Sequence, residues 1–94
     1  MRISNIIWLP RIIDKLDQKH HVIAEEVEEV FFNKPIYRKI KKGHIPGEDL
    51  YATLGRSNAG RYLIVFFIYK LTREALIISA REMDNSERRL YERR

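Results

Sequence analysis

Apolar positions in the first third of the chain predict a short strand and two helices. The run Ile3–Trp8 predicts a strand and ends at Leu9-Pro10, and proline is favoured at the first turn of a helix. Apolar residues recur at helical spacing from Arg11 to Lys19, and this helix is expected to stop near His20-His21. A second amphipathic helix is expected to end before Asn33-Lys34-Pro35.

The rest of the chain predicts strands and one more helix. Four strands are expected, at Tyr37–Lys41, Leu50–Arg56, Arg61–Tyr69 and Ala75–Ala80. Ser57-Asn58-Ala59-Gly60 is the clearest turn, since Asn and Gly accept the positive φ that many hairpins require. Within the last of the hairpin strands, the run Tyr62–Tyr69 is apolar at both alternating positions, which is typical of a central strand covered on both faces. A last helix, capped by Asp84 or Ser86, is expected to run toward Arg94.

These elements predict a mixed α+β fold. Two N-terminal helices and one C-terminal helix would pack on a mainly antiparallel sheet of four to five strands, which Ile3–Trp8 would join. The basic strand Tyr37–Lys41 is expected at an edge of this sheet. A chain of 94 residues suits one modest core, so residues 1–94 are expected to form a single domain.

Composition excludes several kinds of chemistry and location. Because the chain has no cysteine, it has no disulfide framework, thiolate zinc site or cysteine nucleophile. The longest apolar stretch, Tyr62–Tyr69, is too short for a membrane helix. Trp8 is followed at once by Leu9-Pro10-Arg11, which is unlike a signal peptide. A cytoplasmic protein that does not insert into membranes is therefore expected.

Charge is distributed unevenly along a chain whose net charge is +5. Residues 34–44 contain five basic residues and no acidic one, whereas the helix before them carries four glutamates. The basic run, which includes Lys39, Lys41 and Lys42, has two interpretations: protection of an edge strand against aggregation, or contact with phosphate. Arginine supplies eleven of the eighteen basic residues, and its planar fork suits bidentate phosphate binding.

The available side chains restrict the possible catalysis. The chain has no glycine-rich phosphate loop, no metal-ligand spacing and no serine elbow, so any catalysis is expected to use no metal or cofactor. RNA cleavage needs only a base for the 2′-hydroxyl, an acid for the leaving oxygen and cations around the transition state. The candidates for acid-base catalysis are His20, His21, His44, Glu48, Asp49 and Tyr91.

Four motifs, spread over nearly the whole chain from Trp8, resemble those of the BrnT toxins. They are Lys19-His20-His21-Val22, Leu54-Gly55-Arg56-Ser57 followed by Gly60-Arg61, Ile77-Ile78-Ser79-Ala80-Arg81, and Glu87-Arg88-Arg89-Leu90-Tyr91-Glu92. The resemblance implies a RelE-like fold and an endoribonuclease that cleaves mRNA, free or on the ribosome, and so inhibits translation and growth. It also implies a cognate antitoxin of the ribbon-helix-helix type, through which alone the toxin would contact operator DNA.

The chain departs from this family pattern at four positions. The family usually has glycine at the position of His21 and aspartate at the position of Leu9. Its acid-arginine pair appears here with Leu50 in place of arginine, and Leu76 stands where an arginine is common. Two phosphate contacts of the family are therefore missing, and substrate preference or catalytic power can differ.

The resemblance and the charges together define the expected site. The expected catalytic residues are Lys19, His20, Asp49, Arg56 and Arg81, and the expected RNA-binding residues are Lys39, Lys41, Lys42, Arg61, Arg88 and Tyr91, with no metal ligand. The arginines would surround the scissile phosphate where the strand ends, Lys19-His20 and the last helix meet. Structural interpretations also stay open: Lys19 and His20 suit a helix C-terminus, and Arg81 suits a cap of the last helix or a pair with Asp84.

Three functions fit these features. The first is a metal-independent mRNA endonuclease with an arginine cluster. The second is a nucleic-acid-binding module without turnover. The third is a decayed toxin whose apolar groove still receives an antitoxin. Growth arrest that is abolished by Arg56→Ala and Arg81→Ala would separate the first function from the other two.

Overall fold

The computed structural model describes residues 1–94 as one five-stranded mixed sheet with three helices. In chain order the elements are β1 (Asn5–Ile7), α1 (Pro10–His20), α2 (Ala24–Phe32), β2 (Ile36–Lys41), β3 (Asp49–Arg56), β4 (Tyr62–Tyr69), β5 (Glu74–Glu82) and α3 (Asn85–Glu92). The strand order is β1-β5-β4-β3-β2, and only the β1–β5 pair is parallel. The predicted α+β class, the edge position of β2 and the addition of β1 to the sheet are confirmed.

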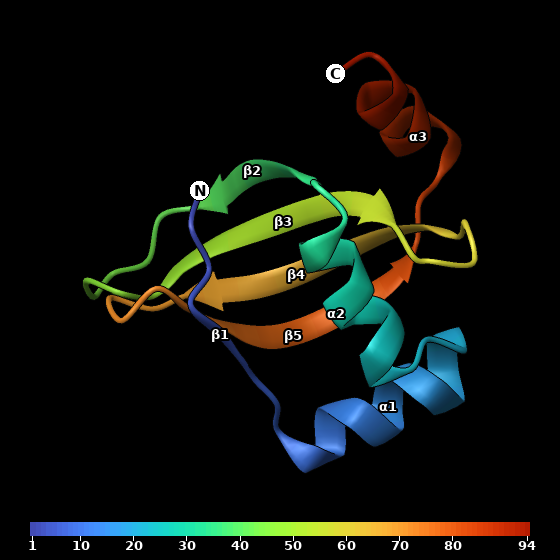
Figure 1. Cartoon of the computed structure of the whole chain (residues 1–94). Coiled ribbons are helices and arrows are strands. Elements are labelled where there is room, and N and C mark those ends of the chain that lie inside the picture. Colours follow the sequence, from blue (N-terminus) through green and yellow to red (C-terminus); the bar gives the residue numbers. More distant parts are fainter.

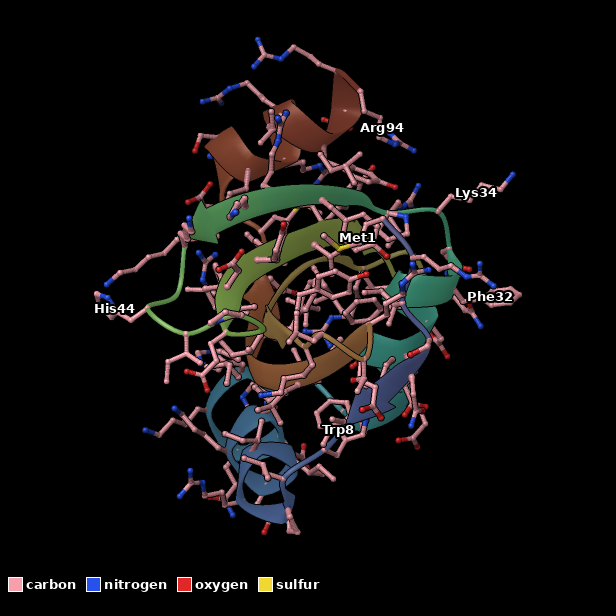
Figure 2. All side chains as sticks on the ribbon, turned by 90° about the vertical axis from the view of Figure 1, so that its left-hand side faces the viewer. Met1, Trp8, Phe32, Lys34, His44 and Arg94 are labelled. Atoms are coloured by element: carbon pink, nitrogen blue, oxygen red, sulfur yellow. The ribbon has the colours of Figure 1, made fainter.

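The helices lie on both sides of this sheet. Figure 1 shows α1 and α2 together on one side and α3 on the other, near the end of the sheet where the β3–β4 hairpin turns. Figure 2 gives the same division in the turned view, with Arg94 beyond the sheet on the α3 side and Trp8 beside α1. None of the three helices has the length and apolar character that crossing a membrane requires. The face under α1 and α2 is called the covered face below, and the other is called the open face.

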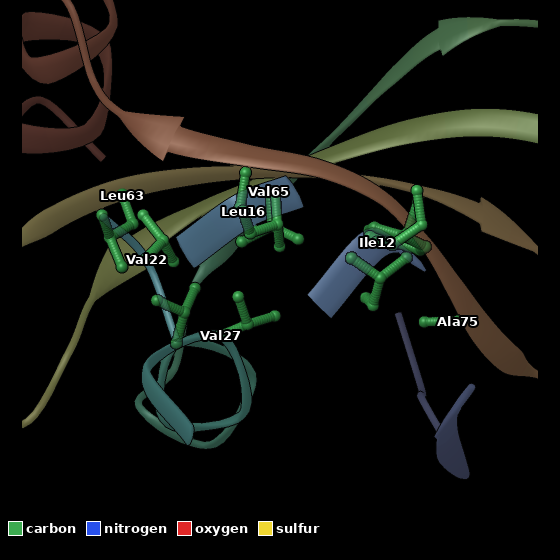
Figure 3. Packing of buried hydrophobic residues seen from close by; sticks show 11 residues of the cluster. Ile12, Leu16, Val22, Val27, Leu63, Val65 and Ala75 are labelled. Atoms are coloured by element: carbon green, nitrogen blue, oxygen red, sulfur yellow. The ribbon is translucent and has the colours of Figure 1, made fainter. Parts of the chain in front are cut away.

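The main core fills the space between the covered face and the first two helices. Leu16 of α1 and Val27 and Val30 of α2 are fully buried against Val65 and Phe67 of β4. Figure 3 shows this packing, with Leu16 and Val22 near Leu63 and Val65, and Ile12 farther along the sheet. These helices form because their apolar residues share one face.

The open face has a smaller core at one end only. Tyr91 of α3 packs on Ala52, Leu54 and Ile64, and each of these four residues is at most 4% exposed. Farther along the open face, Phe66 and Ile68 of β4 are only partly buried. Complete coverage of β4 on both faces is therefore wrong for the open face, because the eight-residue α3 is too short to reach along it.

The end of α1 and the start of α3 are each fixed by specific hydrogen bonds. His21 ends α1 in the left-handed conformation, with φ 54°, and its N–H donates to the carbonyl oxygen of Asp17, so the expected stop near His20-His21 is confirmed. Asp84 begins α3: its carboxylate accepts from the Glu87 N–H, and the Glu87 carboxylate accepts from the Asp84 N–H. Of the two expected caps, Asp84 is the one used.

Candidate functional site

Sheet register gathers arginines at the α3 end of the open face. Arg56 pairs with Tyr62 across the β3–β4 hairpin, and Arg81 pairs with Ile64, the neighbour of Tyr62 on the same face. Arg88 reaches the same place from α3, where its guanidinium carbon lies 3.8 Å from the centre of the Tyr62 ring. The Arg56 guanidinium carbon lies 4.6 Å from that ring centre. Two guanidinium groups therefore share the Tyr62 ring, and the third, that of Arg81, lies beside them on the open face, 5.6 Å from the centre of the Phe66 ring.

Arg81 is held by the last helix. Its Nη1 and Nη2 donate to Glu87 Oε1 and Oε2 at 2.8 and 2.9 Å, and Nη1 also donates to the Glu82 carbonyl oxygen at 3.1 Å. The hydrogen bond from Arg81 lowers the pKa of Glu87, and the same bond raises the pKa of Arg81, so both groups stay charged. Arg81 thus fixes α3 to β5, and its Nε–H stays free of protein partners.

Arg61 faces the covered side, and both of its terminal nitrogens have partners there. Its Nη1 donates to the His21 carbonyl oxygen at 2.7 Å and to the two Glu26 carboxylate oxygens at 2.9 and 3.0 Å, and its Nη2 donates to Glu82 at 3.3 Å. Partial burial by itself lowers the pKa of Arg61, but the bonds to Glu26 and Glu82 outweigh burial and raise it. Arg61 therefore ties the hairpin to the α1–α2 joint and to the end of β5.

Lys19 and His20 lie in the last turn of α1, at the same end of the sheet but on the covered side. The link between them and the hairpin is the bond from Arg61 to His21. Lys19 is exposed and makes no ion pair, and His20 is partly buried. The structure therefore brings Lys19 and His20 to the hairpin end of the sheet, whereas Arg56, Arg81 and Arg88 lie on the opposite side of the sheet.

A hollow of about 390 Å³ opens at this end, where the two sides of the sheet meet. Its lining residues include Arg61 and Glu82 from the covered side and Tyr62 and Arg88 from the open side. No three histidine or acidic side chains anywhere in the chain lie close enough together to hold a metal ion.

Asp49 and Lys39 lie away from the arginines of the hairpin end. Asp49 begins β3, and Lys39 lies on the neighbouring strand β2. Lys39 Nζ is 3.0 Å from Asp49 Oδ2, and Asp49 Oδ1 accepts from the Gly43 N–H at 2.8 Å. The Gly43 bond, followed by the Lys39 bond, lowers the pKa of Asp49, so its carboxylate is a charged structural group. The expected meeting of Asp49 with the arginines does not occur, because β3 runs its full length between Asp49 and Arg56.

The remaining expected RNA-binding residues differ in exposure. Lys41 and Lys42 are exposed and line a second hollow of about 390 Å³, whose other lining residues include Leu50 and Ile68 of the open face. Tyr91 is only 4% exposed and packs edge-on to Tyr62, with ring centres 5.9 Å apart. The structure therefore places Tyr91 in the small core and leaves it no surface for RNA.

Tyr62 is the site residue that sequence reasoning missed, together with the partners Glu26, Glu82 and Glu87. Tyr62 begins the apolar run Tyr62–Tyr69, and the sequence pattern therefore favours a place in the buried strand over a place in the site. The signal was the hairpin: whichever residue pairs with Arg56 must share its face.

Comparison with protein families identifies the chain. The family model described as "Ribonuclease toxin, BrnT, of type II toxin-antitoxin system" matches residues 11–87 of the 94. The chain belongs to the BrnT family. The match runs from α1 into the first turn of α3, so it includes Lys19, Arg56 and Arg81, and Arg88 follows directly after it. A comparison with curated proteins finds no match.

BrnT membership confirms the resemblance carried by the four motifs. It makes the chain a ribonuclease toxin of a type II toxin-antitoxin system, with RNA as substrate and an antitoxin as partner. One departure from the family pattern has a structural consequence. His21 stands where the family usually has glycine, and it occupies a left-handed position that suits glycine.

Proposed function

We propose that this BrnT toxin is a metal-independent endoribonuclease that cleaves mRNA in the cytoplasm and thereby inhibits translation and growth. The observation that carries the proposal is the convergence of Arg56, Arg81 and Arg88 at the hairpin end of the open face. RNA brings a phosphate to such a surface, and guanidinium groups bind phosphate through parallel N–H donors. This arrangement supplies positive charge at one place without requiring a metal ion.

The proposed reaction is attack by a ribose 2′-oxygen on the adjacent phosphorus. The P–O5′ bond breaks, a 2′,3′-cyclic phosphate forms, and the 2′-hydroxyl proton is lost while the leaving 5′-oxygen gains one. Negative charge increases on the phosphoryl oxygens in the transition state, so cations aimed at them accelerate the step. The free Nε–H of Arg81 and the unbonded Nη1 of Arg56 are the donors we assign to this role.

Lys19 and His20 are the groups we propose for proton transfer. They stand at the end of α1 that Arg61 ties to the hairpin, and Arg61 lines the hollow between the two sides of the sheet. An imidazole can accept a proton at one ring nitrogen and donate one from the other, which suits both removal and delivery of a proton. Asp49 is not included, because its carboxylate is bound by Lys39 and the Gly43 N–H.

Lys41 and Lys42 extend the proposed RNA path along the open face. Lys41 pairs with Leu50, which is six residues from Arg56 on β3, or about 20 Å at the usual strand rise. We propose that they bind flanking phosphates. The Lys39 charge is directed to Asp49 on the other face, so Lys39 contributes only to the general positive field.

We also propose that the antitoxin is of the ribbon-helix-helix type, contacts operator DNA for both proteins and covers the open face. The partly buried Phe66 and Ile68 support an apolar contact there, and the arginines beside them would pair with acidic residues of the partner. The same contact would block RNA.

The decisive experiment is induction of the chain in a bacterial host, alone and with the adjacent reading frame, while growth and new 5′ ends of mRNA are followed. Arg56→Ala should lower the cleavage rate at least about a hundredfold, because it removes a cation from the transition state. Arg56 is exposed, so its loss should leave the fold intact. Arg11→Ala, an exposed arginine of α1, is the matched control. Cleavage by the purified toxin should persist in EDTA. Unchanged cleavage by Arg56→Ala would contradict this placement of the site.

The second candidate is RNA binding without turnover. It is favoured by one observation: no histidine lines the hollow at the hairpin end. Salt-dependent RNA binding without new mRNA ends would select it.

A further inference from the structure

Arg56 and Arg88 are both exposed, yet both are placed by contacts with Tyr62. An exposed arginine ordinarily samples many rotamers, and ordering it on binding phosphate opposes affinity. The Tyr62 ring, 4.6 Å from the Arg56 guanidinium carbon and 3.8 Å from that of Arg88, lies within the range of cation–π attraction for each. The ring is itself packed edge-on against the buried Tyr91.

The turn fixes Arg56 from another direction. Arg56 Nε and Nη2 both donate to the Gly60 carbonyl oxygen at 3.3 Å. Gly60 has φ +93°, and a Cβ there would lie 2.9 Å from Arg56 Nη2. Gly60 is therefore required both for the turn and for the close approach of the guanidinium group.

We propose that Tyr62 is a positioning residue of the nuclease site: its ring, supported by Tyr91 and aided by the Gly60 turn, holds the Arg56 and Arg88 guanidinium groups ready for one RNA phosphate. This inference rests on the proposed function and adds to it a residue that acts through Arg56 and Arg88. The donors that remain to Arg56 are Nη1 and the second hydrogen of Nη2, which share one edge of the guanidinium plane. That edge matches the two oxygens of a phosphate.

The test compares Tyr62→Leu with Tyr62→Phe. Leucine keeps apolar bulk but removes the π system, whereas phenylalanine keeps the ring and loses only the long 3.5 Å contact of the hydroxyl with Glu92. Cleavage of a defined RNA by the purified toxin should fall about tenfold in kcat/KM for Tyr62→Leu and stay near the wild-type value for Tyr62→Phe. Thermal melting of both variants reports whether the fold is kept.

A double-mutant comparison separates positioning from general damage. In an Arg56→Ala, Arg88→Ala background, Tyr62→Leu should have almost no further effect on cleavage, because no guanidinium is left to position. An additional tenfold loss there would overturn the inference, as would full activity of Tyr62→Leu. If Arg56→Ala itself is fully active, the proposed function fails instead, so the two failures are distinct.

A measurement on the unmodified protein covers the case in which Tyr62→Leu does not fold. Protons of a guanidinium group stacked on an aromatic ring are shifted upfield in NMR spectra. The Nε–H signals of Arg56 and Arg88 should show this shift in the wild type and in Tyr62→Phe, whereas Arg11 should not. Unshifted signals for Arg56 and Arg88 would overturn the inference.

Discussion

Arg61 Nη1 donates a 2.7 Å hydrogen bond to the carbonyl oxygen of His21, the residue that ends α1 in the left-handed conformation. The bond spans forty positions of sequence and joins the β3–β4 hairpin to the helix that carries Lys19 and His20. A β-carbon in this conformation crowds the following carbonyl group, which costs about 1 kcal/mol. The geometry at this joint is therefore retained by tertiary contacts against a local preference.

His21→Gly should stabilise the toxin. Glycine adopts φ 54° without the penalty that histidine has, although its greater freedom in the unfolded chain offsets part of the gain. We expect the free energy of unfolding to rise by about 0.5–1 kcal/mol, measured from urea denaturation midpoints. Gln18→Gly, one turn earlier in α1, is the control and should lose about 1 kcal/mol. A fall in stability for His21→Gly would contradict the strain argument.

Arg61→Ala should destabilise the fold, because it leaves the largely buried Glu26 carboxylate with the Ile23 N–H but without its guanidinium partner. A loss of about 2 kcal/mol is expected in urea denaturation. Arg61→Lys should lie between the wild type and Arg61→Ala, since one ammonium cannot reach Glu26, Glu82 and the His21 carbonyl group together. Unchanged stability of Arg61→Ala combined with weaker RNA binding would instead indicate that Arg61 contacts RNA.

The fold was largely predictable because its elements depend on local signals. Pro10 begins α1, the apolar spacing of both helices places them on one sheet face, and Asp84 begins α3 with Glu87 in the reciprocal position. The incomplete cover of the open face was not predictable, because periodicity reports that a face is apolar and says nothing of how far a neighbouring helix extends.

The site was only half predictable, and the reason is the hairpin register. A four-residue link, Ser57–Gly60, would pair Arg56 with Arg61 on one face. The observed pairing is Arg56 with Tyr62, closed by the bond from the Ser57 N–H to the Arg61 carbonyl oxygen. A shift of one residue moves a side chain to the opposite face of a sheet. Arg61 therefore points to α1 and α2, and Tyr62 takes its place among the arginines.

The Arg81–Glu87 pair predicts a dependence of stability on pH. Because the folded state lowers the pKa of Glu87, its contribution is present above the ordinary value of 4.5 and is lost as the pH falls through the lower folded value. Glu87→Gln should therefore be less stable than the wild type at pH 7, by about 1 kcal/mol after allowance for the partial exposure of Arg81. The difference should disappear in acid. The exposed Glu25→Gln is the control, and a difference for Glu87→Gln that persists in acid would exclude the ion pair as its cause.

The salt dependence of RNA binding should distinguish the arginines that meet phosphate from the one that does not. Each phosphate contact of a single strand releases counterions, so its loss reduces the slope of log affinity against log salt by about 0.7. Arg56→Ala and Arg88→Ala should each reduce the slope by about that amount. Arg61→Ala should leave it unchanged, because the Arg61 donors are directed to Glu26, Glu82 and His21 and not to RNA. Fluorescence anisotropy with a labelled RNA over a series of salt concentrations measures all three, with Arg11→Ala as the control. A slope that Arg56→Ala does not change would show that RNA does not reach the hairpin end of the open face.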